Sequence, residues 1–234
     1  MKRISISIAV AAVCVVANAQ SFSDGFENAV FSQTDNTTGN HAGDTVTSVV
    51  TWAAVNNSQP LGGTGWFVNT GVFAAHAGTG EVNANYNNTG NIGTIDNYLM
   101  SPVRTFNNGD TISFWTRTVD APAFPDRLYL KLSTAGASIL PSSFTTTLVA
   151  VNPNLTTTGY PNVWTQYSVN ISGLGGPTAG RFALNYNVPN AGFSGSNSDF
   201  IGIDDVVYNS VPEPVSMIAL GAGALALLRR RKSA

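Results

Sequence analysis

Apolar and polar side chains alternate strictly in several short runs of this chain, and this alternation constrains the fold more than any other feature. In residues 127–132, leucine occupies every second position, and arginine, tyrosine and lysine stand between the leucines. Successive side chains on a β-strand point to opposite faces, so one face of such a strand packs and the other meets water. Residues 167–171 and 181–186 repeat the pattern. These runs predict half-buried strands of antiparallel sheets.

Eight runs with strand character lie between turn signals made by glycine, proline and asparagine. They cover residues 65–77, 98–106, 111–119, 127–134, 144–151, 163–171, 181–188 and 200–208. Only 10% of the 234 residues are charged, and β-branched and aromatic residues are spread along the chain, which favours many short strands over long helices. We therefore expect residues 20–210 to form one all-β domain, a two-sheet antiparallel sandwich of the jelly-roll type.

Residues 1–19 have the features of a secretory signal peptide. Two basic residues precede an apolar stretch, residues 4–16, and small side chains stand at Ala17 and Ala19, where signal peptidase requires them. The apolar stretch is shorter than the roughly 20 residues that span a bilayer. We predict export through the Sec machinery and cleavage by signal peptidase before Gln20. An uncleaved N-terminal anchor is the alternative.

Residues 20–210 are acidic. Twelve Asp and Glu residues stand against five basic ones, a net charge of −7, and the basic residues are Arg104, Arg117, Arg127, Lys131 and Arg181. A domain without a basic stripe does not attract a phosphate backbone, so we exclude nucleic acid as a partner. The one cysteine, Cys14, lies in the predicted signal peptide, so the mature protein would contain no thiol and no disulfide.

The C-terminal segment, residues 211–234, combines an extended motif, an apolar run and a basic end. Residues 215–228 are 14 residues without a charge, about 21 Å as a helix, which is short for a bilayer core of about 30 Å. The cluster of Arg229, Arg230, Arg231 and Lys232 would stay on the cytoplasmic side and let the helix reach across by snorkelling. We therefore predict one short transmembrane helix with residues 20–210 outside the membrane.

The motif before that helix is Val211-Pro212-Glu213-Pro214. Its two prolines keep it extended and accessible. Together with the apolar run and the basic end, it resembles the PEP-CTERM sorting signal of Gram-negative bacteria that make extracellular polysaccharide. The resemblance implies transient anchoring in the inner membrane, processing by an exosortase, and delivery to the cell surface or an extracellular matrix such as a biofilm. An ordinary C-terminal anchor that stays in place is the alternative.

A second resemblance covers nearly all of the predicted domain. Short motifs occur in the order seen in choice-of-anchor J domains, which are similar to cleaved-adhesin and MAM-type jelly rolls. These motifs are Asp24-Gly25-Phe26-Glu27, Gly65-Trp66, Ala75-His76-Ala77-Gly78, residues 96–102, residues 112–115, residues 164–171 and residues 201–206. The resemblance implies the same jelly-roll sandwich that the alternation predicts.

The jelly-roll resemblance also implies a structural calcium ion between the first and last strands. Glu27 and Asp205 match the positions of its carboxylate ligands, and calcium prefers oxygen ligands of this kind. Strand alternation places Asp205 on the side of Ile203, facing inward, and Asp204 on the opposite face as a surface residue. Two alternatives to a metal ligand remain open for Asp205, a carboxylate held by hydrogen bonds and a bulge that turns the side chain outward.

Candidate catalytic groups are few. Glycosidases need two carboxyl groups that face each other, and adjacent strand residues such as Asp204 and Asp205 point apart. His41 and His76 are the two histidines, and no serine lies in a nucleophile-elbow sequence. We therefore predict that the protein is not an enzyme, and the alternative is an extracellular hydrolase acting on glycan or protein.

The tryptophans are the candidates for sugar stacking. Trp66, Trp115 and Trp164 occupy positions typical of a sandwich core, which leaves Trp52 as the candidate ligand-binding side chain. The sequence thus predicts an exported, non-catalytic surface or matrix protein. Its expected molecular role is adhesion or binding to exopolysaccharide.

Overall fold

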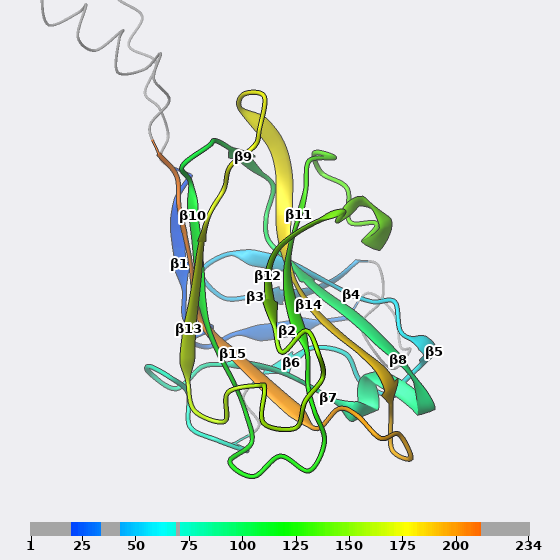
Figure 1. Ribbon diagram of the computed structural model, residues 1–234. Coiled ribbons are helices and arrows are strands. Elements are labelled where there is room, and N and C mark those ends of the chain that lie inside the picture. Colours follow the sequence, from blue (N-terminus) through cyan, green and yellow to red (C-terminus); the bar gives the residue numbers. More distant parts are fainter. Residues whose placement is uncertain (1–19, 34–42, 69–70, 212–234) are drawn as a thin grey trace, which may run out of the picture. The chain divides into compact units, whose positions relative to one another are not determined.

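The computed structural model describes residues 20–33, 43–68 and 71–211, and within them residues 20–210 form one compact unit. Two antiparallel sheets make up this unit, so the predicted two-sheet sandwich is confirmed (Figure 1). One sheet has six strands in the order β13 (Thr165–Asn170), β10 (Thr111–Thr118), β15 (Phe200–Asn209), β7 (Val82–Asn85) and β6 (Phe67–Val68), with β1 (Phe22–Asp24) pairing with β15.

The other sheet has nine strands. Their order is β12 (Thr146–Val151), β11 (Leu128–Ser133), β14 (Thr178–Ala191), β8 (Thr89–Met100), β4 (Thr51–Asn56), β3 (Asp44–Thr47) and β2 (Val30–Ser32). Two short strands extend it, since β5 (Gln59–Leu61) pairs with β8 and β9 (Arg104–Phe106) pairs with β14. The helical turns in the described residues are two 3-10 segments, η1 (Tyr86–Asn88) and η2 (Pro141–Ser143).

The alternating runs form strands where the sequence predicts them, because one face of each is needed to fill the core. The leucines of β11 are buried, and Tyr129 and Lys131 between them face outward and are partly exposed. The predicted strand at residues 65–77 is wrong beyond Val68, because residues 71–81 form a loop that crosses the six-stranded sheet. Strands β2, β3, β4, β5 and β7 and residues 89–97 of β8, which the sequence did not predict, complete the two sheets.

Aromatic side chains fill the space between the sheets, and Trp52 lies among them. Its ring meets those of Phe22, Phe26 and Phe182 at centroid distances of 5.7–5.8 Å. The indole Nε1 donates a 2.9 Å hydrogen bond to Asp24 Oδ2, and the side chain is 0% exposed. The prediction that Trp52 binds a sugar ring is therefore wrong, because core side chains already cover its faces.

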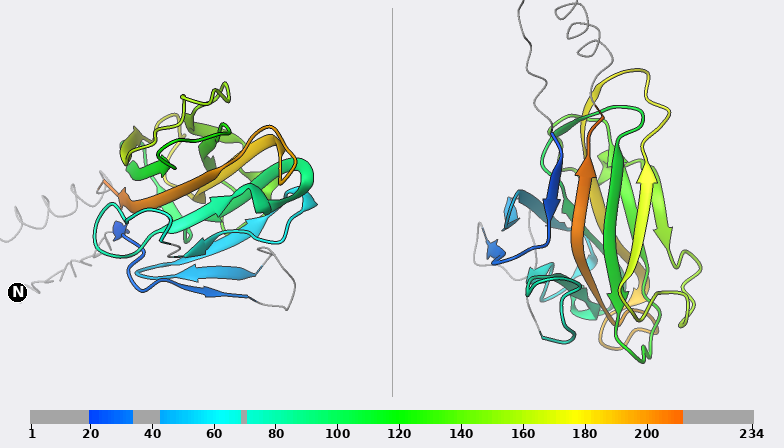
Figure 2. Two further views of the ribbon diagram at one scale, coloured as in Figure 1. Left: turned by 90° about the horizontal axis from the view of Figure 1, so that it is seen from below. Right: turned by 90° about the vertical axis from the view of Figure 1, so that its left-hand side faces the viewer.

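The two ends of the sandwich domain lie side by side. Strand β1 pairs antiparallel with the end of β15, with Phe22 opposite Tyr208 (Figure 2). The Ser210 amide donates a 2.9 Å hydrogen bond to Ser21 Oγ, which continues this pairing to the last described residues. The predicted signal peptide, residues 1–19, and the motif and helix predicted within residues 212–234 lie outside the described residues. Among the residues that are described, no helix is long and apolar enough to cross a bilayer.

Candidate functional site

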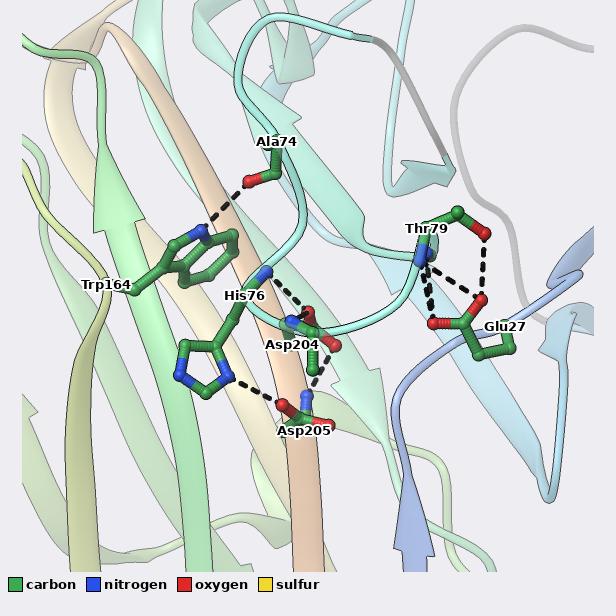
Figure 3. Close-up of polar contacts among 9 residues, drawn as sticks. Glu27, Ala74, His76, Thr79, Trp164, Asp204 and Asp205 are labelled. Carbon is green, nitrogen blue, oxygen red and sulfur yellow. Dashed lines mark hydrogen bonds and ion pairs between the residues drawn. The ribbon is translucent and has the colours of Figure 1, made fainter.

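The loop at residues 71–81 lies across the outer face of the six-stranded sheet, and aromatic side chains fix it there. Trp164 Nε1 donates a 2.9 Å hydrogen bond to the Ala74 carbonyl (Figure 3). The His76 ring stacks on Trp115 at a centroid distance of 3.7 Å, and Phe73 packs edge-on against Trp164 at 5.5 Å. Gly202 lies beneath the loop, where a Cβ atom would come within 2.4 Å of the Phe73 ring. The loop therefore needs a glycine below it.

Three side chains bring their polar atoms together where this loop meets β15: His76 of the loop and Asp204 and Asp205 of the strand. His76, Asp204 and Asp205 each place one potential ligand atom within 4.8 Å of the others. Asp205 Oδ2 lies 2.6 Å from His76 Nδ1. Asp204 Oδ2 accepts hydrogen bonds from the His76 and Ala77 amides at 2.8 and 3.2 Å, and Asp204 Oδ1 accepts one from the Asp205 amide at 2.6 Å. These hydrogen bonds tie the loop to β15.

A β-bulge in β15 explains where the two aspartates point. Ser113 of β10 pairs with Val207, but Trp115 pairs with Asp204, so Asp205 is an extra residue on its strand. Its φ of 46° lies in the left-handed region. The prediction that Asp205 faces inward is wrong, and the alternative of an outward-turning bulge holds, since its side chain is 28% exposed beside His76. Asp204 does face away from the core, but the loop buries it fully.

Burial gives Asp204 unusual acid–base behaviour. Desolvation raises its pKa to about 7, although the amides of Ala77, Asp205 and His76 act in the opposite direction. The neighbouring Asp205 carboxylate adds a smaller upward contribution to the same pKa. At neutral pH this carboxyl group is therefore close to its titration midpoint.

Glu27 binds the far end of the same loop. Its carboxylate accepts hydrogen bonds from the Thr79 amide at 2.9 Å, the Thr79 hydroxyl at 2.9 Å and the Gly80 amide at 3.3 Å (Figure 3). These donors, led by the Thr79 amide, lower the Glu27 pKa. Gly78 has a φ of 61°, and a Cβ atom there would lie 1.8 Å from Glu27 Oε1. Glu27 thus fixes the end of the loop by hydrogen bonds to Thr79 and Gly80.

The observed donor set does not fit the predicted calcium site. Figure 3 shows the Glu27 carboxylate turned toward Thr79 and the Asp205 carboxylate turned toward His76. Glu27 is not part of the group that converges, and that group contains an imidazole. Calcium takes six to eight oxygen ligands, whereas imidazole suits transition metals. A calcium ion shared by Glu27 and Asp205 would require both side chains to turn.

Within the described residues, the His76–Asp205 pair has an acid and an imidazole but no hydroxyl group beside the ring. Asp205 orients the His76 ring through Nδ1, but within the described residues no hydroxyl group hydrogen-bonds to the imidazole to act as a nucleophile. His41, the other histidine, lies outside the described residues. The chemistry that the geometry supports is attachment of the loop to the sheet.

Comparison with known proteins identifies the tail and the fold. Residues 210–232 match the PEP-CTERM protein-sorting motif, so the chain carries this sorting signal. The sandwich is similar to the K1 cleaved adhesin domain of Lys-gingipain from Porphyromonas gingivalis W83, with a TM-score of 0.53 and 22% identity over 82% of this chain and 99% of that one. The K2 domain of Lys-gingipain aligns over the same shares with a TM-score of 0.51 and 16% identity.

At these identities the likeness establishes the fold alone. The predicted resemblance to cleaved-adhesin jelly rolls is confirmed at that level. No curated protein matches the sequence.

Proposed function

We propose that this chain is an exosortase substrate whose sandwich is a non-catalytic binding module of the cell surface or the extracellular matrix. The observation that carries the proposal is the PEP-CTERM match at residues 210–232, which begins directly after β15 ends at Asn209. In this scheme the Sec machinery and signal peptidase export the chain, the inner membrane holds it transiently, and an exosortase releases it. Its partner outside the cell is exopolysaccharide.

The positions of the two domain ends support this role. Gln20 and Val211 leave the sandwich at one end, because β1 and β15 pair there. An attachment at either terminus therefore holds the domain by that end only. Such an attachment leaves the partly exposed side chains on the outer face of the nine-stranded sheet, such as Tyr129 and Lys131, to a partner.

Hydrolysis is the weaker alternative. The His76–Asp205 pair resembles part of a catalytic unit. However, the His76 ring stacks on Trp115, and Asp205 is the extra residue of the β-bulge to which the loop is attached. Replacing His76 by alanine should therefore leave matrix binding intact. Loss of a measurable hydrolytic turnover in that variant would establish the enzyme instead.

Sorting is tested by replacing both motif prolines, Pro212→Ala with Pro214→Ala, in the native organism. We expect the wild-type protein in the washed surface or matrix fraction, without its C-terminal residues by mass spectrometry. The double variant should stay in the membrane fraction and keep Ala234. Ser216→Ala, a substitution just beyond the motif, is the matched control and should be sorted normally. Matrix-derived wild-type protein that still ends in Ala234 would refute the proposal.

Binding is tested separately by incubating the purified chain with matrix fractions from the same organism. Retention on a polysaccharide fraction is the expected result. A protein that is sorted correctly but binds no matrix fraction would be a coat component without this ligand.

A further inference from the structure

The outer face of the nine-stranded sheet presents a row of polar and basic side chains. Strand register places them together, because Tyr129 of β11 is opposite Asn185 of β14, which is opposite Tyr98 of β8. Arg127 and Lys131 stand two positions from Tyr129 on either side. We call this row the β11 face, and its partly exposed members are Asp96, Arg127, Tyr129, Lys131 and Asn187. Tyr98 lies in the same row but is buried.

The two cations of the β11 face have no carboxylate partner in the described part of the chain. Lys131 Nζ lies over the rings of Tyr98 and Tyr129 at 5.4 and 5.6 Å, and its one hydrogen bond is a 3.4 Å contact with the Tyr98 hydroxyl. Partial burial lowers the Lys131 pKa. A half-buried ammonium group with so few acceptors gains from an added anion.

Arg127 is held in place by neutral acceptors. Its Nε donates to the Asn187 carbonyl at 2.9 Å, and Nη2 donates to Asn187 Oδ1 at 2.6 Å. The guanidinium carbon lies 5.1 Å from the Tyr129 ring centroid. The charge is therefore positioned beside Tyr129 but is not neutralised.

Asp96 is the carboxylate nearest to these cations, and amide donors occupy it. Oδ1 accepts hydrogen bonds from the side-chain amides of Asn185 and Asn187, both at 3.0 Å, and Oδ2 accepts one from Asn57 at 2.8 Å. Its charge still raises the Lys131 pKa, but less than burial lowers it. The β11 face thus carries two cations and one acid in a domain whose net charge is −7.

The exposed side chains of the face are polar, which suits a ligand rich in hydroxyl groups. None of the large exposed apolar side chains in the described residues lies on β11 or β14. Tyr98 and Asn185 are buried, and the Phe144 ring packs on Tyr98 at a centroid distance of 5.7 Å. A ligand would therefore contact the partly exposed side chains of Arg127, Tyr129 and Lys131.

From this charge complementarity we propose that the β11 face binds a carboxylate-bearing polysaccharide, with Lys131 and Arg127 contacting its acidic groups. This inference rests on the proposed binding function and names its ligand class and its surface. The two basic positions are about 13 Å apart along the strand. An extended acidic chain that runs along β11 contacts both.

The test measures binding of polygalacturonate to the purified full chain, with dextran as the neutral probe and polyglutamate as the acidic peptide probe. We expect binding to polygalacturonate that weakens as salt rises. Lys131→Gln and Arg127→Gln should each lower its affinity about fivefold to tenfold. Arg104→Gln is the matched control, because it removes one positive charge on β9, away from this row, and its binding should not change.

The outcomes separate this inference from the proposed function. Equal binding of dextran, equal binding of polyglutamate, or unchanged binding by Lys131→Gln would each overturn the assignment of the β11 face to an acidic polysaccharide. If Lys131→Gln still binds the organism's matrix as the wild type does, the binding function stands and another surface of the domain binds the ligand. If the wild-type chain binds no matrix fraction and no polygalacturonate, both proposals fail.

Discussion

The two outer faces of this sandwich differ in how the protein covers them. On the six-stranded sheet, the loop at residues 71–81 is stacked on Trp115 and Trp164 and buries Asp204. On the nine-stranded sheet, the β11 face keeps Tyr129 and Lys131 partly exposed and leaves its cations without carboxylate partners among the described residues. Polar groups on the first face are satisfied within the chain, whereas on the second face Asp96 is satisfied but the charges of Arg127 and Lys131 are not paired with a carboxylate. A polar cluster therefore indicates binding only where the chain has not already used its hydrogen bonds.

The largest expected effect is on the covered face. Asp204→Ala leaves the amides of His76, Ala77 and Asp205 without their acceptor, and we expect a loss of about 3 kcal/mol in the free energy of unfolding. Asp96→Ala on the open face should cost about 1 kcal/mol, because two of its three amide donors, Asn57 and Asn187, are exposed enough to bond to water instead. Urea unfolding measures both. Equal losses would show that the two faces are alike.

Gly202→Ala should have the next largest effect. The added Cβ atom meets the Phe73 ring at 2.4 Å and the Trp164 ring at 3.1 Å, so we expect a loss of about 2 kcal/mol from overpacking. Gly63→Ala is the matched control, since nothing lies within 4 Å of the position that a Cβ atom would take there. Thermal and urea unfolding measure the stability of both variants. Equal losses of stability in Gly202→Ala and Gly63→Ala would contradict the close fit of the loop over Gly202.

Stability should also depend on pH through Asp204. Burial raises its pKa to about 7 in the folded protein, compared with about 3.9 in an unfolded chain. The folded state therefore holds this proton more tightly, and its contribution to stability declines as pH rises from about 4 to about 7 and then levels off. Melting temperatures across this range should decline less in Asp204→Asn than in the wild type. Identical slopes would remove Asp204 as the cause.

A smaller effect is expected for Lys131→Gln. Burial already lowers the pKa of this amine, so losing its charge should change the free energy of unfolding by no more than about 0.5 kcal/mol. The same variant loses affinity for polygalacturonate if the β11 face is a binding surface. A large loss of stability would show instead that Lys131 is a structural residue.

Calcium should have the smallest effect. In the observed geometry Glu27 and Asp205 face different partners, so we expect added Ca²⁺ or a chelator to leave the melting temperature unchanged. A ligand that binds only the folded state raises stability by mass action. A rise with Ca²⁺ that disappears in Glu27→Gln would show that the two carboxylates turn and share an ion.

The strands with alternating side chains could be predicted because they depend on a local pattern. The alternation at 127–132 needs no knowledge of the partner strand, and the structure has β11 there. Asp205 could not be placed in this way, because the bulge arises from the register of β15 against β10, which are about ninety positions apart in the chain. The bulge shifts the alternation by one residue, so the side chain turns to the other face.

The same limit applies to Glu27 and Trp52. Their partners, Thr79 and Asp24, are set by which segments fold over each other, not by neighbouring residues. The β11 face shows the converse. The sequence identifies Arg127, Tyr129 and Lys131 as the solvent-facing side of a strand. Only the pairing of β11 with β14 and of β14 with β8 shows that Asp96 already accepts hydrogen bonds from side-chain amides.

The pairing of β1 with the end of β15 limits the space around the sorting motif. Asn209 ends the last strand, and three peptide steps to Pro212 reach about 11 Å at full extension. Any protease that grips the motif must therefore accept a folded domain almost at its active-site entrance, or first separate Ser21 from Ser210. Lengthening this tether with a few flexible residues would distinguish the two cases, because it should speed cleavage only if Ser21 must otherwise separate from Ser210.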